Sequence, residues 1–181
     1  MRKWTVRSTR TLLQRPPWLR VEEQDVELPN GQTIEGYLLT PIPEVCMVFA
    51  LTRDQRVLFV EQYKHGAGVT MWDLPAGYLD EDEAPLTCAQ RELEEETGYL
   101  AEDWRYLGGW LIDPNRTAAR FHYYLALDAK PHGQQHLDVT EEIEIHRVPL
   151  SDLSSVLTAG RVESLASLAG ITTGLAVLKS T

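Results

Sequence analysis

Residues 3–40 contain apolar and polar runs, separated by turn residues, that are typical of β-strands. The pair Asn30-Gly31 separates two of these runs and predicts a two-residue hairpin turn, because such a turn needs a positive φ at both central positions. Prolines at positions 41 and 43 end the region. The pattern predicts an antiparallel β-arm over residues 1–42 and a second domain over residues 43–181. The arm either packs on its own domain or reaches across to a second subunit.

The second domain mixes strands and helices without strict alternation. Strands are expected where short apolar runs lie between turn residues, and helices where proline and glycine mark the ends. The expected strands are 45–51, 57–62, 106–111, 121–127 and 142–148. The expected helices are 83–97, 151–159 and 162–179, and residues 66–70 are expected to form a loop. This order predicts an α+β or mixed α/β fold, in which sheets and helices form a sandwich.

Composition narrows the class of protein. The chain has 181 residues with 43% hydrophobic, and its 17 Lys+Arg against 27 Asp+Glu give a net charge of −10. Such a charge argues against nucleic acid and anionic membranes as partners. The longest apolar run, Val45–Leu51, is far too short for a membrane span, and the N-terminus lacks the apolar stretch of a signal peptide. Two cysteines without CxxC spacing favour a reducing, cytoplasmic location.

The expected helix over residues 83–97 carries Glu92, Glu95 and Glu96 on one arc about 100° wide, which borders its apolar face. Like charges four residues apart, such as Glu92 and Glu96, destabilise an isolated helix by about 0.2–0.5 kcal/mol. The arrangement becomes favourable if a divalent cation lies among the carboxylates, and Mg²⁺ and Mn²⁺ prefer such oxygen ligands. The alternative interpretation is a solvated acidic helix face.

The loop before this helix can supply a further oxygen ligand. Pro75 fixes one φ, and Gly77 allows the following turn. The backbone carbonyl of Ala76 can therefore lie beside the start of the helix. A carbonyl and several glutamates form half of a Mg²⁺ coordination shell, which water and phosphate oxygens would complete.

These residues together resemble the signature of the Nudix hydrolases. The fixed positions are Gly77, Glu83, Arg91-Glu92-Leu93, Glu95-Glu96 and Gly98, separated by five, seven, one and one residues. Tyr99 follows, where the family usually has an aliphatic residue. The resemblance is dense over about residues 45–150. It implies an α/β/α sandwich with mixed sheets, in which the signature forms a loop, a helix and a second loop.

The resemblance also implies an activity and a set of roles. Nudix enzymes hydrolyse a nucleoside diphosphate linked to another group, and two or three Mg²⁺ or Mn²⁺ ions are implied here. The implied metal ligands are Glu92, Glu95, Glu96 and the carbonyl of Ala76, with Glu95 and Glu96 also catalytic. Arg91 would orient these glutamates and Glu83 would be a structural or outer-shell acid. Gly77 and Gly98 would hold the turns.

A second resemblance points to the ADP-ribose pyrophosphatase subgroup. Gln62-Tyr63-Lys64 is similar to its Gln-Tyr-Arg, although Lys64 replaces a bidentate contact with a point charge. Pro114 lies fifteen residues after Tyr99, where the subgroup has a marker proline, but Asn115 and Ala119 depart from the usual Gly and Glu. An N-terminal β-arm is typical of this subgroup, where it exchanges between the subunits of a homodimer.

The base is inferred from the same subgroup, and the other site residues from the chemistry of the substrate. In this subgroup a glutamate on a late loop acts as the base, and Glu141, then Glu142, are the candidates at that place. The cations nearest for phosphate are Arg53, Lys64 and Arg116, and Pro114 would also line the substrate site. The nucleobase needs an aromatic platform, for which Trp18 on the arm is preferred over Trp72 and Trp110. The alternatives are solvated loop acids for the glutamates, ordinary surface charge for the cations and core or interface packing for the tryptophans.

The resemblance leaves several functions open. The first is hydrolysis of ADP-ribose or a related nucleoside diphosphate sugar to a nucleoside monophosphate and a sugar phosphate. The alternatives are GDP-sugars, dinucleotides such as NADH or diadenosine compounds, and a nucleoside-triphosphate sanitiser, against which the β-arm and Pro114 argue. A non-catalytic Nudix-fold sensor is a further alternative, which the complete set of signature glutamates disfavours.

Overall fold

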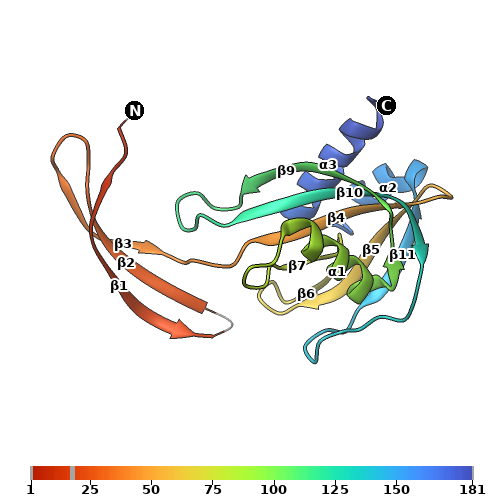
Figure 1. The fold of residues 1–181 in the computed structure, drawn as a ribbon, viewed down its shortest axis with the longest axis horizontal. Coiled ribbons are helices and arrows are strands. Elements are labelled where there is room, and N and C mark those ends of the chain that lie inside the picture. Colours follow the sequence, from red (N-terminus) through yellow and green to blue (C-terminus); the bar gives the residue numbers. More distant parts are fainter. Residues whose placement is uncertain (1, 17–18, 181) are drawn as a thin grey trace. The chain divides into compact units, whose positions relative to one another are not determined.

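The computed structural model describes residues 2–16 and 19–180, which divide into two compact units (Figure 1). The first, here called the arm unit, contains Met1–Pro43 together with Leu111–Arg120. The second, here called the body unit, contains Glu44–Trp110 and Phe121–Thr181. The grouping of residues 111–120 with the N-terminal strands is not visible in the local sequence pattern.

The arm unit is built on a three-stranded antiparallel sheet in the order β1-β2-β3. Its strands are β1 (Thr5–Arg15), β2 (Leu19–Glu27) and β3 (Thr33–Leu39). Of the described residues in these strands, Val26 alone is buried. Charged side chains pair across the strands instead, and Arg10 Nε donates to Glu23 Oε1 at 2.7 Å. The arm unit therefore has the expected strands but almost no core of its own.

The predicted two-residue turn at Asn30-Gly31 is wrong. Residues 28–32 form a longer loop, closed by bonds from Leu28 N to Gln32 O at 2.8 Å and from Gly31 N to Leu28 O at 2.9 Å. Gly31 has a φ of 86°, whereas Asn30 does not take a positive φ. Its side-chain Oδ1 instead accepts the Gln32 N–H at 3.0 Å, which is the local bond that Asn favours in turns.

Residues 111–120 join the arm unit through hydrogen bonds to β3 and the residue after it. Thr40 N donates to Arg116 O at 2.8 Å, and Arg116 Nη1 donates to Leu38 O at 3.1 Å. Tyr37 Oη donates to Asn115 O at 2.7 Å. These contacts join segments that are more than seventy residues apart in the chain.

The body unit contains a mixed sheet, as predicted. Its strands follow the order β11-β5-β4-β10-β8, while β6 pairs with β5, β7 with β4, and β9 with β10. The pair β4 and β10 is parallel, whereas β5 pairs antiparallel with β4, β6 and β11. The strands are β4 (Val45–Thr52), β5 (Arg56–Lys64), β6 (Val69–Asp73), β7 (Ala76–Tyr78), β8 (Tyr99–Leu100), β9 (Asp103–Leu111), β10 (Arg120–Pro131) and β11 (Glu144–Pro149).

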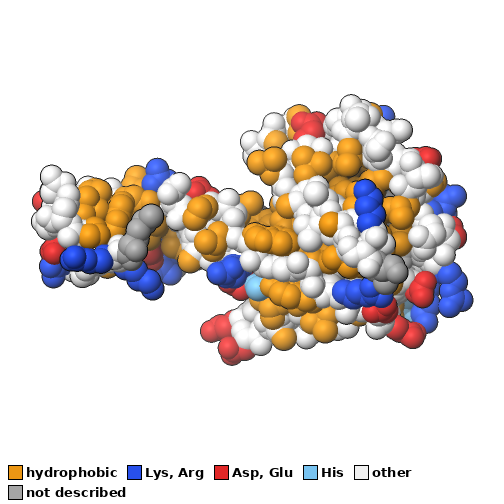
Figure 2. All heavy atoms as spheres, turned by 90° about the horizontal axis from the view of Figure 1, so that it is seen from above, with side chains coloured by type: hydrophobic (Ala, Val, Ile, Leu, Met, Phe, Trp, Pro, Cys, Tyr) orange, Lys and Arg blue, Asp and Glu red, His pale blue; other side chains and the backbone are white. Residues whose placement is uncertain are grey.

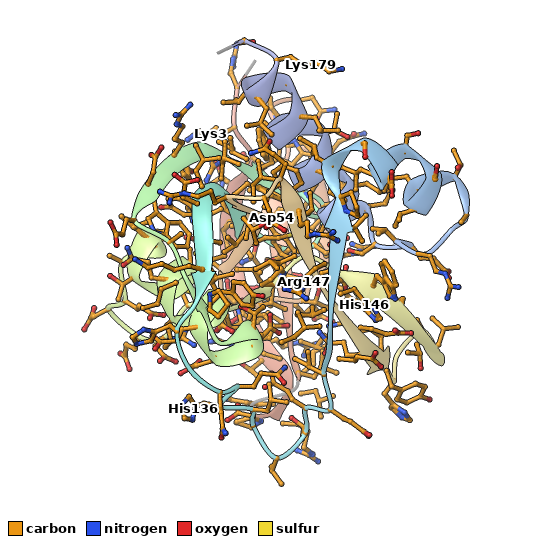
Figure 3. The ribbon with its side chains drawn as sticks, turned by 90° about the vertical axis from the view of Figure 1, so that its right-hand side faces the viewer. Lys3, Asp54, His136, His146, Arg147 and Lys179 are labelled. Atoms are coloured by element: carbon orange, nitrogen blue, oxygen red, sulfur yellow. The ribbon has the colours of Figure 1, made fainter. Side chains whose placement is uncertain are left out.

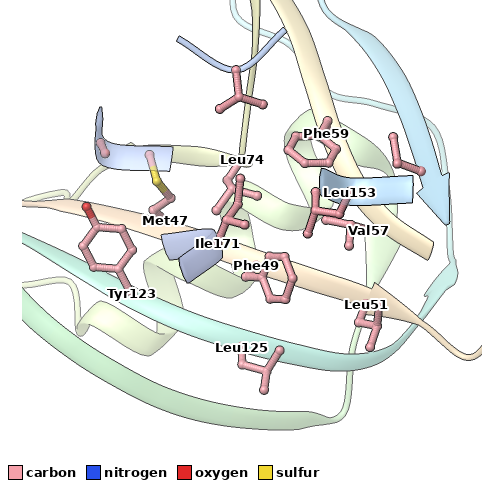
Figure 4. Packing of buried hydrophobic residues seen from close by; sticks show 13 residues of the cluster. Met47, Phe49, Leu51, Val57, Phe59, Leu74, Tyr123, Leu125, Leu153 and Ile171 are labelled. Carbon is pink, nitrogen blue, oxygen red and sulfur yellow. The ribbon is translucent and has the colours of Figure 1, made fainter. Parts of the chain in front are cut away.

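Helices cover both faces of the central strand β4, which is buried along its whole length. One side of β4 packs into a cluster with α2 (Leu153–Thr158) and α3 (Leu165–Leu178), through side chains such as Phe49 and Leu51 (Figure 4). The other side, including Val48, packs against α1 (Pro85–Thr97). A short 3₁₀ helix, Leu150–Asp152, precedes α2. The predicted α/β/α sandwich is therefore confirmed.

Helix α3 lies unusually close to the sheet because glycines face it. A Cβ added to Gly174 would lie 2.4 Å from Phe49 Cδ1, and one added to Gly170 would lie 2.8 Å from Leu74 Cδ1. Side chains larger than hydrogen therefore do not fit between this part of α3 and the strands beneath it.

Most element boundaries differ from the prediction by a few residues. Val69 and Thr70 belong to β6 rather than to a loop, because they pair with Tyr63 and Lys64 of β5. Helix α3 begins at Leu165, after its N-cap Ser164, and β11 begins only at Glu144. None of the helices in the described part of the chain has the length and hydropathy needed to cross a membrane.

Candidate active site

Helix α1 brings its glutamates to the edge of the core. Pro85 lies in its first turn, and Gly98 ends it in a left-handed conformation with a φ of 69° and an N–H that donates to Glu94 O at 2.7 Å. Leu93 is fully buried, and its neighbours Glu92 and Glu96 are only 8% and 2% exposed. The prediction that the acidic arc borders the apolar face is therefore confirmed.

A recess of about 370 Å³ collects most of the predicted site residues. Helix α1 contributes Glu92, Glu95, Glu96 and Arg91, and strand β7 contributes Ala76 and Gly77. Strand β5 adds Gln62 and Lys64, and the loop before β11 adds His136, Asp138 and Glu141. Tyr78 and Asp80 complete the lining.

Arg91 holds three carboxylates in place. Its Nη1 donates to Glu92 Oε1 at 2.6 Å and to Glu95 Oε2 at 3.0 Å. Its Nε and Nη2 donate to the two oxygens of Glu83 at 3.0 and 2.9 Å, and Nη2 also donates to Tyr78 O at 3.1 Å. The bonds to Arg91 are the largest cause that lowers the pKa of Glu83. Arg91 thus has the geometry needed to orient the glutamates.

Burial makes two of the glutamates difficult to ionise. Desolvation is the main cause that raises the pKa of Glu92 to about 7, although Arg91 opposes the shift. Desolvation also raises the pKa of Glu96 well above its usual value, although the Ala76 N–H donates to its Oε2 at 2.8 Å. The charge of Glu141 contributes to both shifts. These carboxylates therefore lack sufficient positive charge nearby when no cation is bound.

Gly77 is required by the position of Glu92. A Cβ added to Gly77 would lie 2.0 Å from Glu92 Oε1, so any other residue would force the Glu92 carboxylate away from its present position beside Arg91. The glycine at this position therefore lets the loop backbone approach the helix closely enough for both to line the recess.

The donor set fits a hard divalent cation. Three carboxylates of α1 and that of Glu141 line the recess together with Ala76, whose backbone carbonyl is a further oxygen donor. Oxygen ligands of this kind suit Mg²⁺ and Mn²⁺. A cation among them would offset the burial, and secondarily the mutual repulsion, that raise the pKa values of Glu92 and Glu96.

A second group of possible ligands was missed by the sequence analysis. Glu61, Glu144 and His146 each offer an atom, and these atoms lie within 4.8 Å of one another. His146, labelled in Figure 3, contacts Glu61 through its Nε2 at 2.6 Å and stacks on Trp72 with ring centroids 4.1 Å apart. One face of Trp72 is therefore covered, and the bond to His146 is the largest cause that lowers the pKa of Glu61.

The other predicted substrate residues lie outside the glutamate recess. Arg53 lines a separate cleft with Glu102 and Lys130, and Glu142 lines another with Glu61. The Arg116 guanidinium lies 5.8 Å from the centroid of the Tyr37 ring, inside the arm unit to which Pro114 also belongs. Trp110 packs on Tyr123 with centroids 5.0 Å apart, and Trp18 lies outside the described residues. The roles given to these residues stay predictions.

Two family models match the chain. The NUDIX domain matches residues 41–168, and the nucleoside diphosphate sugar hydrolase N-terminal domain matches residues 4–37. The chain belongs to the Nudix family. Family membership and the complete signature confirm the prediction of an enzyme of the Nudix pyrophosphohydrolase class.

Relatives of this Nudix protein carry several names. It is 31% identical over 140 residues to an ADP-ribose pyrophosphatase of Bacillus subtilis, covering 77% of this chain and 75% of the relative. It is 32% identical over 161 residues to the CMP-5'-(N-acetyl-N-hydroxy-3-aminopropyl)phosphonate hydrolase of Streptomyces rubellomurinus, covering 89% and 76%. It is 31% identical over 145 residues to the methanol dehydrogenase activator of Bacillus methanolicus, covering 80% and 78%.

A solved structure agrees with the fold. The crystal structure of an ADP compounds hydrolase superposes with a TM-score of 0.85 at 22% identity, and covers 99% of this chain and 96% of that protein. The match spans the arm strands as well as the body, so both parts of the predicted fold class are confirmed.

Proposed function

We propose that this Nudix enzyme hydrolyses the diphosphate bond of ADP-ribose or a related nucleoside diphosphate sugar. The products would be AMP, or another nucleoside monophosphate, and a sugar phosphate. The observation that carries the proposal is the gathering of Glu92, Glu95, Glu96, Ala76 and Lys64 around one recess. The match of residues 4–37 to a domain named for nucleoside diphosphate sugar hydrolases supports the substrate class.

The signature glutamates Glu92, Glu95 and Glu96 and the Ala76 carbonyl would hold two or three Mg²⁺ or Mn²⁺ ions. Such ions neutralise charge on a diphosphate and make bound water more acidic. Arg91 keeps Glu92 and Glu95 in position through bonds of 2.6 and 3.0 Å. Lys64, at the edge of the same recess, offers an ammonium to a phosphate oxygen.

Glu141 is our first choice for the base. Its carboxylate lines the recess, and the Asp138 N–H donates to its Oε2 at 2.9 Å, which leaves the other oxygen free to accept a proton. An attacking water would pass its proton to Glu141 as its oxygen bonds to one phosphorus, and the other phosphate would leave with the bridging oxygen. Glu142, which lines a neighbouring cleft, is the second candidate.

We further propose a homodimer formed through the arm unit. In Figure 2, hydrophobic side chains cover much of the arm unit at the left, beside Lys and Arg along one edge. Trp4, Val6, Leu12, Leu19 and Leu38 are among its exposed hydrophobic residues. An arm with so little core gains most from a second copy that covers this surface. Three residues of the same unit would then contribute to substrate binding: Trp18, Pro114 and Arg116. We also propose a cytoplasmic location, which fits such a soluble substrate.

The names of one relative and one solved structure support a second candidate substrate class. The relative is named for hydrolysis of a CMP-linked phosphonate, and the solved structure is named for ADP compounds. Nucleoside monophosphates linked to groups other than ribose phosphate, including dinucleotides and GDP-sugars, therefore belong in the test.

The test is a substrate panel with product identification. ADP-ribose, GDP-mannose, NADH, diadenosine compounds and nucleoside triphosphates are each incubated with Mg²⁺, with Mn²⁺ or with EDTA, and products are identified by mass spectrometry. We expect a nucleoside monophosphate and a sugar phosphate from a sugar nucleotide, only with metal. Release of pyrophosphate from triphosphates would favour a sanitiser, and tight binding with no product would favour a sensor. ¹⁸O-labelled water would show which phosphorus is attacked.

A further inference from the structure

The C-terminal helix α3 is bonded to the loop that leads into the glutamate recess. Ser167 on α3 is fully buried. Its Oγ donates to Asp73 Oδ1 at 2.7 Å and accepts the Leu74 N–H at 2.9 Å. A single hydroxyl thus uses its donor and an acceptor site on two consecutive residues at the end of β6.

Each partner of Ser167 leads to a different part of the recess. Asp73 Oδ2 lies 3.8 Å from Lys64 Nζ, and Lys64 lines the recess. Leu74 lies two residues before Ala76, whose N–H donates to Glu96 Oε2 at 2.8 Å. Ser167 is therefore linked through Asp73 to Lys64 and through the Leu74 backbone to the segment that bonds Glu96, although it lies more than ninety residues from Asp73 and Leu74.

The distance between Asp73 Oδ2 and Lys64 Nζ indicates how the carboxylate positions the ammonium group. At 3.8 Å it is too long for a hydrogen bond, so the carboxylate attracts the ammonium without using its N–H donors. The hydroxyl of Ser167 occupies the other carboxylate oxygen and so fixes which oxygen faces Lys64. Lys64 is thereby held near one position while its donors stay available to a phosphate oxygen.

A second recess of about 230 Å³ adjoins the first at this place. The two share five lining residues, Gln62, Lys64, Ala76, Gly77 and Tyr78. The second adds Asp73 and Ser164, the N-cap of α3. The buried end of β6 thus forms a wall of the space beside the glutamates, and a shift of Asp73 would move groups that face both recesses.

We propose that Ser167 and Asp73 are positioning residues of the hydrolytic site, which hold the Lys64 ammonium and the Ala76 backbone where the diphosphate binds. This inference rests on the proposed function. Ser167 acts through Asp73 and Leu74, and neither Ser167 nor Asp73 takes part in a proton transfer. Helix α3, remote in sequence from the signature, is in this way part of the catalytic framework.

The test is a double-mutant cycle with Lys64. Asp73→Asn keeps an acceptor for Ser167 but removes the charge that attracts Lys64, and Lys64→Ala removes its partner. We expect Asp73→Asn to lower kcat/KM by about 10–100-fold, mostly through KM, with an unchanged melting temperature. In the Lys64→Ala background the same substitution should have almost no further effect, because its target is gone.

Ser167→Ala completes the test, because it removes both bonds. Its effect should exceed that of Asp73→Asn and should include kcat, since the Ala76 loop also loses its support. Thr172→Ala is the matched control on α3, since its Oγ1 bonds only within the helix, to Leu168 O at 2.7 Å. Additive losses of Asp73→Asn and Lys64→Ala, or wild-type kinetics in both Asp73→Asn and Ser167→Ala, would overturn the inference. If instead the wild-type enzyme hydrolyses no substrate of the panel, the proposed function itself fails.

Discussion

The two units of the molecule are stabilised in different ways. In the body unit, β4 is buried on both faces, between α1 on one side and α2 and α3 on the other. In the arm unit, Val26 is the only buried residue among those described in the three strands. Three-stranded sheets of this kind need an apolar face or a partner to be stable. The buried core of the body unit is therefore sufficient to stabilise it, whereas the arm unit depends on contacts beyond its strands.

The pKa values of carboxylates also differ between the two units. In the arm unit, the hydrogen bond from Ser8 is the largest cause that lowers the pKa of Asp25, a half-buried group on the sheet. In the body unit, burial raises the pKa of Glu92 to about 7. A lowered pKa on a surface sheet reflects satisfied pairing, whereas a raised pKa beside other acids marks a site prepared for a cation.

The largest effect is expected from Glu96→Gln in the body unit. Loss of a metal-binding carboxylate should lower kcat by about 10³-fold, equivalent to about 4 kcal/mol of activation free energy. The melting temperature should not change, because the glutamine side chain can still accept the hydrogen bond from the Ala76 N–H. Steady-state kinetics and thermal melts measure both, with Glu94→Gln on the same helix as the control. Turnover within tenfold of wild type would remove Glu96 from the metal site.

Matched leucines test the difference in packing. Leu125→Ala, at a fully buried position in the body unit, should reduce the free energy of unfolding by about 2–5 kcal/mol. Leu12→Ala, at a position 48% exposed in the arm unit, should change it by less than about 0.5 kcal/mol at protein concentrations too low for the proposed homodimer to form. Urea unfolding measures both. An equally large loss for Leu12→Ala would mean that a partner covers the arm unit, and its dependence on protein concentration would identify a second copy.

The metal-free protein should lose stability as the pH rises. The raised pKa of Glu92, about 7, means that the folded state binds this proton more tightly than the unfolded state does. Its contribution is therefore complete below the usual glutamate pKa and is lost as the pH rises to about 7, by about 3 kcal/mol. The measurement is the difference in unfolding free energy between wild type and Glu92→Gln with EDTA. Mg²⁺ should abolish the decline, and parallel curves without metal would contradict the assigned burial.

A small effect is also expected for the ion pairs of the arm unit. Arg10 bonds Glu23 at 2.7 Å, but its side chain is 71% exposed. Arg10→Ala should therefore cost less than about 1 kcal/mol, and the cost should shrink in high salt. Urea unfolding at two salt concentrations measures this. A cost well above that range would show that charge pairing, rather than a partner, stabilises the arm unit.

Local patterns predicted the elements whose causes are local. The buried run of β4, the helix α1 between Pro85 and Gly98, and the arc of glutamates could all be read from residues close together in the chain. The signature likewise predicted Ala76 and Gly77 at the recess, because its spacing is a property of a single loop and helix.

Contacts between distant segments could not be read in this way. The bond of Ser167 to Asp73, the pairing of Glu61 with His146, and the association of Arg116 with Leu38 each join residues more than seventy positions apart. No periodicity encodes which strand or helix will meet which. The prediction of a two-residue turn at Asn30-Gly31 was wrong for another reason. The Asn30 side chain accepts the Gln32 N–H, and this bond outweighed the preference of Asn-Gly for a two-residue hairpin turn.

The glycines of α3 have a consequence for the orientation of that helix. Gly170 and Gly174 follow Ser167 at intervals of three and four residues, so all three occupy one stripe along the helix. Rotation of α3 about its axis would bring a larger side chain against Phe49 or Leu74, where only hydrogen fits. The same stripe thus fixes the direction in which the Ser167 hydroxyl points from the helix. On heating, we therefore expect loss of α3 packing to disturb the reaction centre before the sheet unfolds.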